Sequence, residues 1–298
     1  MKKIVECVPN FSEGRDADKI EKIIGAFKGV DGVKFLDYHK DADHNRLVVT
    51  AVGEPQPLMH AVIAAVGIAV EIIDMRTQHG QHPRMGAVDV IPFIPLKNVS
   101  MEETIALSKE TAKAIWEKYG LPVFLYEASA ANRKRMNLAE IRKGQFEGMA
   151  EKIKTPGWMP DFGGTQIHPT AGVVAVGVRK PLIAFNINLD TNNIETAKAI
   201  ARSIRYISGG LRHCKAIGIA LKGRGITQVS TNMTDFTKTP LYRVVELVRI
   251  EAKRYGVNVV GTEIVGLVPM EALVDAASYY MGLENFTTEQ VLEARIAE

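Results

Sequence analysis

Cysteine is scarce in this sequence of 298 residues, in which Cys7 and Cys214 are the only two. So few cysteines, with no partner spacing between them, argue against a disulfide framework and favour a reducing compartment, where both would be buried thiols. No uninterrupted run of about 18 apolar residues occurs, and the first apolar stretch already breaks at Pro9 and Asn10. We therefore expect a cytoplasmic protein with no signal peptide and no membrane partner.

An excess of charge of one sign is also missing. The 37 lysines and arginines nearly balance the 34 aspartates and glutamates, and basic and acidic residues are interspersed. Nucleic-acid binding needs a concentrated basic surface, so we expect no nucleic-acid partner. The 46% of hydrophobic and 24% of charged residues are instead typical of a globular protein, and the length suits two compact domains.

Several common catalytic and nucleotide-binding motifs are absent as well. The sequence has no G-x-G-x-x-G after its first predicted strand, no G-K-S/T phosphate loop, no G-x-S-x-G elbow and no S-x-x-K pair. Cys7 lies inside an apolar strand, where a thiol is usually inert. The missing motifs argue against a dinucleotide site, a phosphate loop and a serine nucleophile of these kinds.

Strands and helices are predicted in the same order in both halves of the chain. The first set is a strand at 4–8, a helix at 18–27, strands at 32–39 and 44–53, a helix at 58–74 and a strand at 87–95. The second set is a strand at 181–189, a helix at 192–208, strands at 214–221 and 226–235, a helix at 240–256 and a strand at 257–269. This βαββαβ order is that of a ferredoxin-like unit and predicts an α/β (α+β) protein with two such subdomains. Because the halves share little identity, two coincidental α/β stretches remain the alternative.

The first set is followed by an extension. It contains a predicted helix at 101–120, a short strand at 121–127 and a segment rich in glycine and proline at 155–172. We place the boundary between the subdomains near Arg179 to Pro181, which gives subdomains 1–180 and 181–298.

The loop "RTQHGQHPRMG" contains two histidines three residues apart, His79 and His82. That spacing would align two metal ligands on a helix, but Gly80, Pro83 and Gly86 disfavour a helix there. A zinc site also needs at least three suitable protein ligands, and no cysteine lies nearby. We predict no metal site.

His82 is the better candidate for catalysis. The following Pro83 restricts its backbone to extended geometry, and a histidine can act as a base near neutral pH. His79 lies beside Gly80 and is less constrained. From this loop alone, two solvated histidines without a function are the more favoured alternative.

Two loops that follow predicted strands also carry polar residues. In "VPNFSEGR", Asn10, Glu13 and Arg15 suit a small polar ligand or the cap of the next helix, and capping alone explains Ser12. In "DADHNR", Arg46 and the neighbouring histidine lie in a turn between strands, where an exposed hairpin is as good an interpretation as a functional site.

A third loop, "PDFGGTQIHPTAG", has the glycines that let backbone approach a flat ligand, but it lacks a nucleotide-binding pattern. Its spacing does not identify the ligand. The residues alone therefore predict a two-lobed α/β protein with polar loops and do not give a reaction.

Six motifs in order resemble those of the formiminotransferase family. They are "VECVPNFSEGR", "HGQHPRMGAVDVIPFIP", "MPDFGG", "KPLIAFNINL", "QVSTNMTDF" and "VGLVPMEALVDAA", and the resemblance runs from Val5 to about Tyr280. The resemblance implies two ferredoxin-like subdomains with a folate-binding cleft between them, and a homodimer. Some members carry a cyclodeaminase domain on the same chain. This chain ends at Glu298, so we expect any cyclodeaminase partner to be a separate polypeptide.

The resemblance also implies a reaction. Members transfer the formimino group of N-formimino-L-glutamate to N5 of tetrahydrofolate, which gives 5-formiminotetrahydrofolate and L-glutamate, in histidine degradation and one-carbon metabolism. Tetrahydrofolate is then a co-substrate, and no metal or redox cofactor is required. Two alternatives stay open, namely formyl transfer between 5-formyltetrahydrofolate and glutamate, and a folate-binding protein without turnover.

Site residues follow from the matching motifs. The family's catalytic histidine corresponds to His82 and not to His79. The substrate's carboxylates call for cationic partners, for which Arg46 and Arg84 are the first candidates and Arg15 the third, with Asn10 completing the set. The folate-contacting segment corresponds to Gly163, Gly164, Thr165, Gln166, Ile167, His168, Pro169, Thr170, Ala171 and Gly172.

Position 39 departs from the family's pattern. Some relatives carry an acidic residue there, near the active site, whereas this chain has His39. The nearby Asp37, Asp41 or Asp43 could supply the acid instead.

Overall fold

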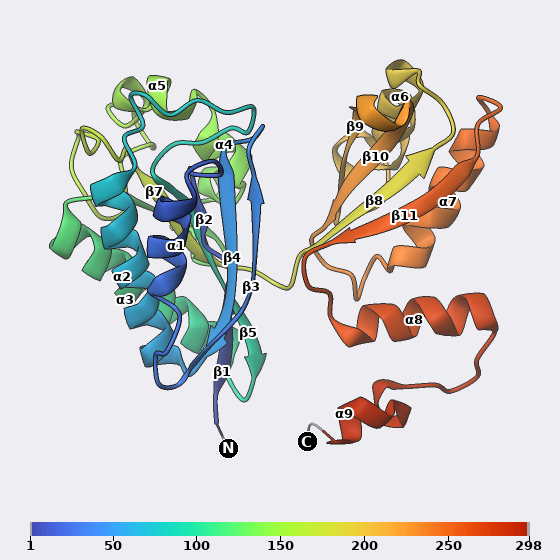
Figure 1. The fold of residues 1–298 in the computed structure, drawn as a ribbon, viewed down its shortest axis with the longest axis horizontal. Helices are drawn as coiled ribbons and strands as arrows, with labels where there is room; N and C mark the ends of the chain where they lie inside the picture. The colour runs from blue at the N-terminus through green and yellow to red at the C-terminus, as the bar shows by residue number, and fades with distance from the viewer. Residues whose placement is uncertain (1, 297–298) are drawn as a thin grey trace. The chain divides into compact units, whose positions relative to one another are not determined.

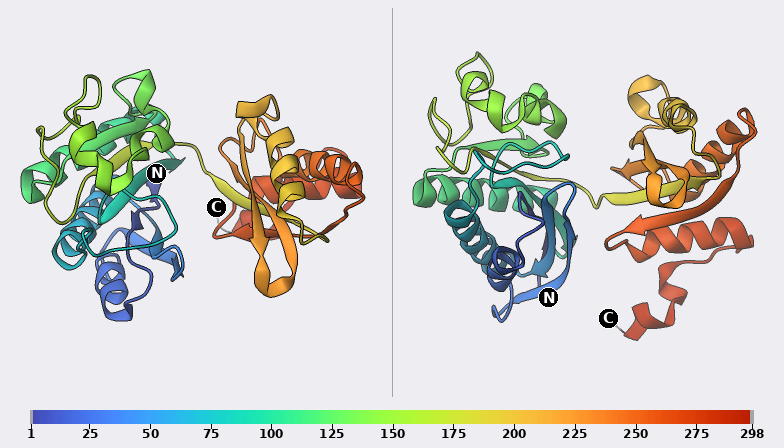
Figure 2. Two further views of the ribbon diagram at one scale, coloured as in Figure 1. Left: turned by 90° about the horizontal axis from the view of Figure 1, so that it is seen from above. Right: turned by 45° about the horizontal axis from the view of Figure 1, so that its top comes forward.

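The computed structural model describes residues 2–296 and divides the chain into two units, Met1–Arg179 and Lys180–Glu298 (Figure 1). Each unit has its own sheet with helices lying against it, as the two further views also show (Figure 2). Both cysteines are buried and free, as the sequence predicted.

The first unit begins with the predicted βαββαβ order. Its elements are β1 (Ile4–Cys7), β2 (Asn10–Phe11), α1 (Ala17–Gly25), β3 (Val33–Asp41), β4 (Arg46–Gly53), α2 (Pro55–Ile72) and β5 (Val88–Lys97). The strands lie in the order β3-β4-β1-β5 and every pair is antiparallel, which is the ferredoxin-like arrangement. The short β2 continues the line of β1, since it also pairs with β4 and β5.

The extension adds two more strands to the same sheet. It comprises α3 (Met101–Tyr119), β6 (Val123–Glu127), η1 (Arg133–Arg135), α4 (Leu138–Arg142), α5 (Gln145–Lys152) and β7 (Val174–Val178). β7 pairs in parallel with β5, and β6 pairs in parallel with β7. The long helix and β6 were expected from the sequence, whereas β7, whose residues are all buried, was not.

Helices cover both faces of this sheet. One core packs side chains of α1, α2 and α3 against the strands, with Ile23, Val62 and Ile115 fully buried. A second core lies between the strands and α4 and α5, and contains Ile141 and Met149. The helices α4 and α5 therefore cover the face of the sheet opposite to that covered by α1, α2 and α3.

α2 is a nearly apolar helix. It has 18 residues with a mean hydropathy of 1.4, so its length and composition alone would allow it to cross a membrane. Leu58, Val62 and Ala65 belong to the core, and 44% of the helix is buried. The core helix of a globular domain meets the same criteria, so this helix is weak evidence for a membrane span.

The second unit repeats the ferredoxin-like order. Its elements are β8 (Ile183–Leu189), α6 (Ile194–Ile204), η2 (Tyr206–Ser208), β9 (Cys214–Leu221), η3 (Lys222–Arg224), β10 (Ile226–Met233), α7 (Leu241–Lys253), β11 (Val259–Val265), α8 (Met270–Met281), η4 (Thr288–Gln290) and α9 (Leu292–Ile296). The four strands lie in the order β11-β8-β10-β9 and are antiparallel. Both predicted ferredoxin-like subdomains are thus confirmed.

Helix caps in both units follow the local sequence. Asp16 caps α1 by accepting hydrogen bonds from the backbone of Asp18 and Lys19, and Asn193 caps α6. Capping does not explain Ser12, contrary to our expectation, because its buried hydroxyl donates to the carbonyl of Gly86 over 2.8 Å. Ser12 therefore ties the first loop to the loop that carries His82.

Candidate active site

Strand pairing brings three polar residues together in the first unit. β2 lies between β4 and β5, and Asn10 pairs with Val48 on one side and with Val90 on the other. Arg46 is the first residue of β4, and Asp89 is the second residue of β5. Neighbouring strands of one sheet thus present an amide, a guanidinium and a carboxylate to the same place.

His82 joins this cluster from the loop before β5. Nη1 of Arg46 lies 2.7 Å from Nδ1 of His82 and 3.3 Å from Oδ2 of Asp89. Nη2 of Arg46 donates to the side-chain oxygen of Asn10. Because a guanidinium only donates, Nδ1 of His82 is the acceptor and the proton of the neutral ring is on Nε2. The structure therefore brings together three of the five predicted catalytic and substrate-binding residues.

A second arginine, which the sequence analysis did not single out, completes the cluster. Arg142, the last residue of α4, binds both carboxylate oxygens of Asp89. Asp89 is only 1% exposed, and it also accepts the backbone N–H of Met85. Burial would raise the pKa of the Asp89 carboxyl, but Arg142 and Arg46 outweigh burial and the pKa is lowered. Two guanidiniums on one carboxylate leave an excess of one positive charge.

This surplus of positive charge acts on His82. Burial, then Arg46 and Arg142, lower the pKa of the half-buried His82 ring to about 3, against the opposing effect of Asp89. Burial also lowers the pKa of Arg46, to about 10, so Arg46 is still charged at neutral pH. His82 is accordingly a neutral imidazole beside a cationic pair.

One asparagine holds the loops of the site together. Oδ1 of Asn45 accepts the backbone N–H of Gly14 over 2.9 Å, and its Nδ2 donates to the carbonyl of His79 over 3.1 Å. Asn45 is buried and its φ of 50° lies in the left-handed region, which asparagine tolerates better than most residues. A Cβ on Gly80 would come within 2.1 Å of the carbonyl oxygen of His44, so these loops touch through their backbones.

Asp41 supports a second histidine near His82. Its Oδ1 accepts the backbone N–H of His44 over 2.8 Å, and its Oδ2 lies 2.9 Å from Nδ1 of the same residue. Partial burial would raise the pKa of the Asp41 carboxyl, but the hydrogen bonds from His44 lower it. The ring of His44 meets that of His82 edge-on, with the centroids 6.0 Å apart. Of the acids considered near His39, Asp41 is thus linked to this site through His44.

Arg84 lies in another network. Its Nε and Nη2 donate to Gln78 over 3.1 Å each, and Nη1 and Nη2 bind the Glu147 carboxylate at 3.0 and 2.7 Å. Nη1 also donates to Gln145. The side chain is buried, and the pair with Arg84 lowers the pKa of Glu147. A substrate carboxylate at Arg84 would have to displace Glu147. Arg15, in contrast, is exposed and donates from Nε to the carbonyl of Ala42 over 2.8 Å.

The predicted folate segment meets the His82 loop at its C-terminal end. Gly172 forms a bridge with Gly86 and another with His168, and the backbone N–H of Ala87 donates to Ala171 over 2.9 Å. Nδ1 of His168 accepts the N–H of Ala171 over 3.0 Å, and burial lowers the pKa of the ring. Near the start of the segment, residues 164–166 are exposed.

The second unit carries a polar cluster that was not expected from the sequence. Nε2 of Gln228 on β10 lies 2.9 Å from Oδ1 of Asn188 on β8 and 3.3 Å from Oε2 of Glu263 on β11. Asn186, two residues before Asn188, also donates to Glu263. The signal was the alternation of polar and apolar residues in "AFNINL" and "TQVSTNM", which places the polar side chains on the face opposite the core.

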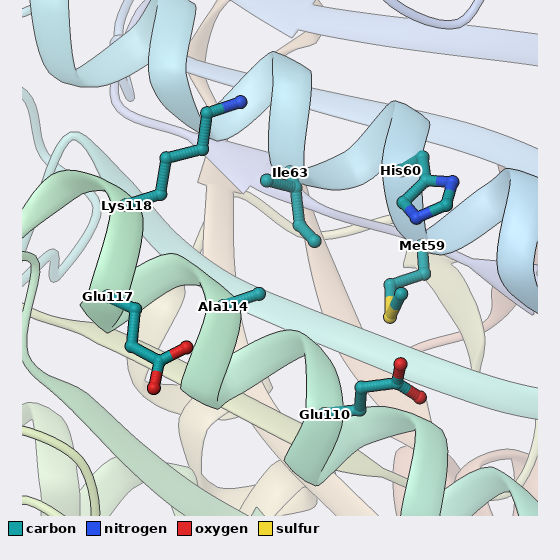
Figure 3. A pocket seen from close by; sticks show the side chains of 7 residues that line it. All are labelled: Met59, His60, Ile63, Glu110, Ala114, Glu117 and Lys118. Atoms are coloured by element: carbon teal, nitrogen blue, oxygen red, sulfur yellow. The ribbon is translucent and has the colours of Figure 1, made fainter.

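A surface hollow of about 490 Å³ lies between α2 and α3 (Figure 3). Its lining comprises Met59, His60, Ile63, Glu110, Ala114, Glu117 and Lys118. None of these residues belongs to a predicted motif.

Within residues 2–296, no group of three or more histidine, cysteine, aspartate or glutamate side chains is arranged to hold a metal ion.

Fold and site together define a protein of two ferredoxin-like units with a neutral histidine beside two arginines that share a buried carboxylate. Residues 4–179 match the N-terminal subdomain of the formiminotransferase domain, and residues 184–297 match the formiminotransferase domain. The chain belongs to the formiminotransferase family.

Named relatives agree with this assignment. A glutamate formimidoyltransferase of Streptococcus pyogenes serotype M1 is 52% identical over 294 residues, which cover 98% of each chain. One of Thermoplasma acidophilum is 46% identical and covers 98% of this chain and 97% of its own. A formimidoyltransferase-cyclodeaminase of Dictyostelium discoideum is 41% identical over all of this chain, which spans 56% of that longer protein.

Proposed function

We propose that this protein transfers the formimino group of N-formimino-L-glutamate to N5 of tetrahydrofolate. Its relatives of the same length are named glutamate formimidoyltransferase. The single observation in the structure that carries the proposal is the neutral His82 beside the Arg46–Asp89–Arg142 cluster. Neither formyl transfer nor folate binding without turnover is favoured by these findings.

The reaction moves one proton as well as the formimino group. N5 of tetrahydrofolate forms a bond to the formimino carbon, and the proton of N5 must leave. The carbon then releases the amino nitrogen of glutamate, which must gain a proton. A neutral histidine can take the first proton and deliver it to the second site, so that atoms and charges balance. One such acid–base group is typically worth about 10²–10⁴ in rate, and alignment of the two substrates adds further acceleration.

The arginines suit the other end of the substrate. Formiminoglutamate carries two carboxylates, and guanidiniums bind carboxylates through paired, charge-assisted hydrogen bonds. Arg46 and Arg142 carry one positive charge more than Asp89 compensates. In the proposed complex these two arginines bind a substrate carboxylate, Asn10 orients Arg46, and Arg15 and Arg84 are further candidates for the second carboxylate.

Tetrahydrofolate is the proposed co-substrate, and the segment from Gly163 to Gly172 is the proposed folate contact in the first unit. The bridge between Gly172 and Gly86 supports this role because it joins the segment to the loop of His82. A homodimer, a cytoplasmic location and a cyclodeaminase as a separate partner are further proposals that follow from the family.

Turnover with formiminoglutamate and tetrahydrofolate tests the proposal. We expect the wild type to form 5-formiminotetrahydrofolate and His82→Ala to fold normally with kcat lower by about 10²–10⁴. His79→Ala is the matched control, because His79 is an exposed histidine of the same loop. Parallel assays with 5-formyltetrahydrofolate and glutamate separate formyl from formimino transfer. A wild type that binds folate but is inactive with both donors would refute the proposal.

A further inference from the structure

His82 presents no free lone pair in this structure. Nδ1 accepts the hydrogen bond of Arg46 over 2.7 Å, and the other ring nitrogen of the neutral imidazole then carries the hydrogen. A general base needs a lone pair that points to the proton it removes. We call this state of His82 closed, because Arg46 occupies the only lone pair with which the ring could accept a proton. Arg46 is itself a proposed ligand of the substrate.

The charges around the ring disfavour its protonation. Arg46 from β4, Asp89 from β5, Arg142 from α4 and His44 from the turn before β4 face His82. The pKa of about 3 that burial and the two arginines impose on His82 lies far below the neutral range in which a catalytic base works best. For His82 to act as a base, some event in the catalytic cycle must therefore offset the positive charge of the two arginines beside the ring.

A carboxylate can supply that event. In this cluster Nη1 of Arg46 contacts His82 and Asp89, and Nη2 donates one hydrogen bond to Asn10. The side chain of Arg46 is 19% exposed, so a ligand can reach it. A carboxylate offers a guanidinium two acceptor oxygens and a full negative charge, whereas the neutral His82 ring offers Arg46 one acceptor and no charge. A substrate carboxylate can thus compete with the neutral His82 ring for the same N–H donor, and its charge offsets the surplus left by Asp89.

We infer that Arg46 closes His82 in the free protein and that a carboxylate of the substrate opens it by drawing the guanidinium away from Nδ1. This inference rests on the proposed function. It makes Arg46 a positioning residue as well as a carboxylate ligand. It also gives the protein a way to activate its base only when the acidic donor is bound.

Histidine-ring NMR of the wild type tests the closed state directly. The ring pKa of His82 is measured without ligand, with saturating formiminoglutamate and with saturating formamidine, in each case without folate so that no transfer occurs. Formamidine carries the reacting carbon but no carboxylate. We expect formiminoglutamate to raise the pKa by two units or more and formamidine to leave it unchanged. A pKa near 6.5 without ligand, or one that bound formiminoglutamate does not raise, overturns the inference.

Kinetics with both donors separates this role from simple substrate binding. In Arg46→Gln the ring is open at all times, so we expect kcat/KM for formamidine to rise about tenfold or more over wild type. The same variant should lose activity with formiminoglutamate. An arginine that only binds the carboxylate predicts no change with formamidine, and that result overturns the inference. Arg76→Gln is the matched control, because Arg76 is an exposed arginine of the segment that carries His82 and pairs with Asp74 outside this cluster.

The proposed function and this inference can fail separately. If the wild type transfers the formimino group but its His82 pKa does not respond to formiminoglutamate, the inference fails and the function stands. If the wild type transfers nothing, the function fails first. The NMR measurement needs no variant, so it decides the inference even if Arg46→Gln does not fold.

Discussion

The guanidinium of Arg142, at the end of α4, binds both oxygens of the fully buried Asp89 carboxylate on β5. α4 belongs to the extension, whereas β5 closes the βαββαβ core. This pair therefore fixes the extension to β5, and His82 and Arg46 lie beside the same carboxylate of β5. Because Asp89 also holds Arg46, one carboxylate sets the positions of both arginines.

Asp89→Asn removes the negative charge and leaves two arginines close together. We expect a loss of about 3 kcal/mol or more in the free energy of unfolding, because the remaining buried charges are no longer compensated. Urea unfolding of the variant and the wild type measures this loss. Asp74→Asn is the control, because solvent screens the pair of Asp74 with Arg76 and its loss should cost far less than the loss of Asp89. Equal effects of the two substitutions would contradict the central role of Asp89.

The low pKa of His82 predicts a pH dependence of stability. The folded-state pKa of about 3 lies below the ordinary value of 6.5, so the unfolded chain binds this proton first as the pH falls. The stability that the neutral ring contributes is therefore complete above pH 6.5 and is lost progressively down to about pH 3. Each pH unit in this window costs up to about 1.4 kcal/mol.

His82→Gln isolates this contribution. Between pH 6 and pH 4 the wild type should lose up to about 1.4 kcal/mol per pH unit more than the variant, since glutamine does not titrate. His168 also has a lowered pKa, but it titrates equally in both proteins. Parallel unfolding curves at four pH values give the difference. Identical slopes for the two proteins would show that His82 titrates normally in the folded state.

Most of the architecture was predictable from periodicity. Hydrophobic repeats of about two and 3.6 residues predicted most helices and strands of both ferredoxin-like units, because most of these elements bury only one face. β7 was missed because "VVAVGV" is a short, fully buried run that follows a segment rich in glycine and proline. Such a run has no polar face, so periodicity does not identify it as a strand.

The candidate site was predictable only in part. His82, Arg46 and Asn10 lie in polar loops or at strand ends, where the sequence draws attention to them. Asp89 had a weaker signal, a single acid inside the apolar run "AVDVIPF", where burial without a cation would be costly. Arg142 had none, because its role depends on how the extension folds back onto β5. Tertiary contacts of this kind leave no local pattern.

Gly172 tests the contact between the proposed folate segment and the His82 loop. Its φ is 72°, and a Cβ there would lie 2.3 Å from the carbonyl oxygen of Met85. Gly172→Ala should therefore destabilise the protein by about 1–3 kcal/mol and displace the loop that follows His82. Gly164→Ala is the control for stability, because a Cβ there meets nothing within 4 Å. Thermal unfolding of both variants measures the loss of stability. An unchanged stability of Gly172→Ala would contradict the close approach of Gly172 to the backbone of Met85.

Arg84 separates a structural role from substrate binding. Its guanidinium already binds Gln78, Gln145 and Glu147, so releasing it for a substrate carboxylate would break several hydrogen bonds. If the network is structural, Glu147→Gln should leave KM for formiminoglutamate unchanged and cost less than about 1 kcal/mol, because Glu147 is largely exposed. If Arg84 binds the substrate, freeing it from Glu147 should lower KM. Steady-state kinetics of Glu147→Gln with formiminoglutamate therefore assigns Arg84 to one role or the other.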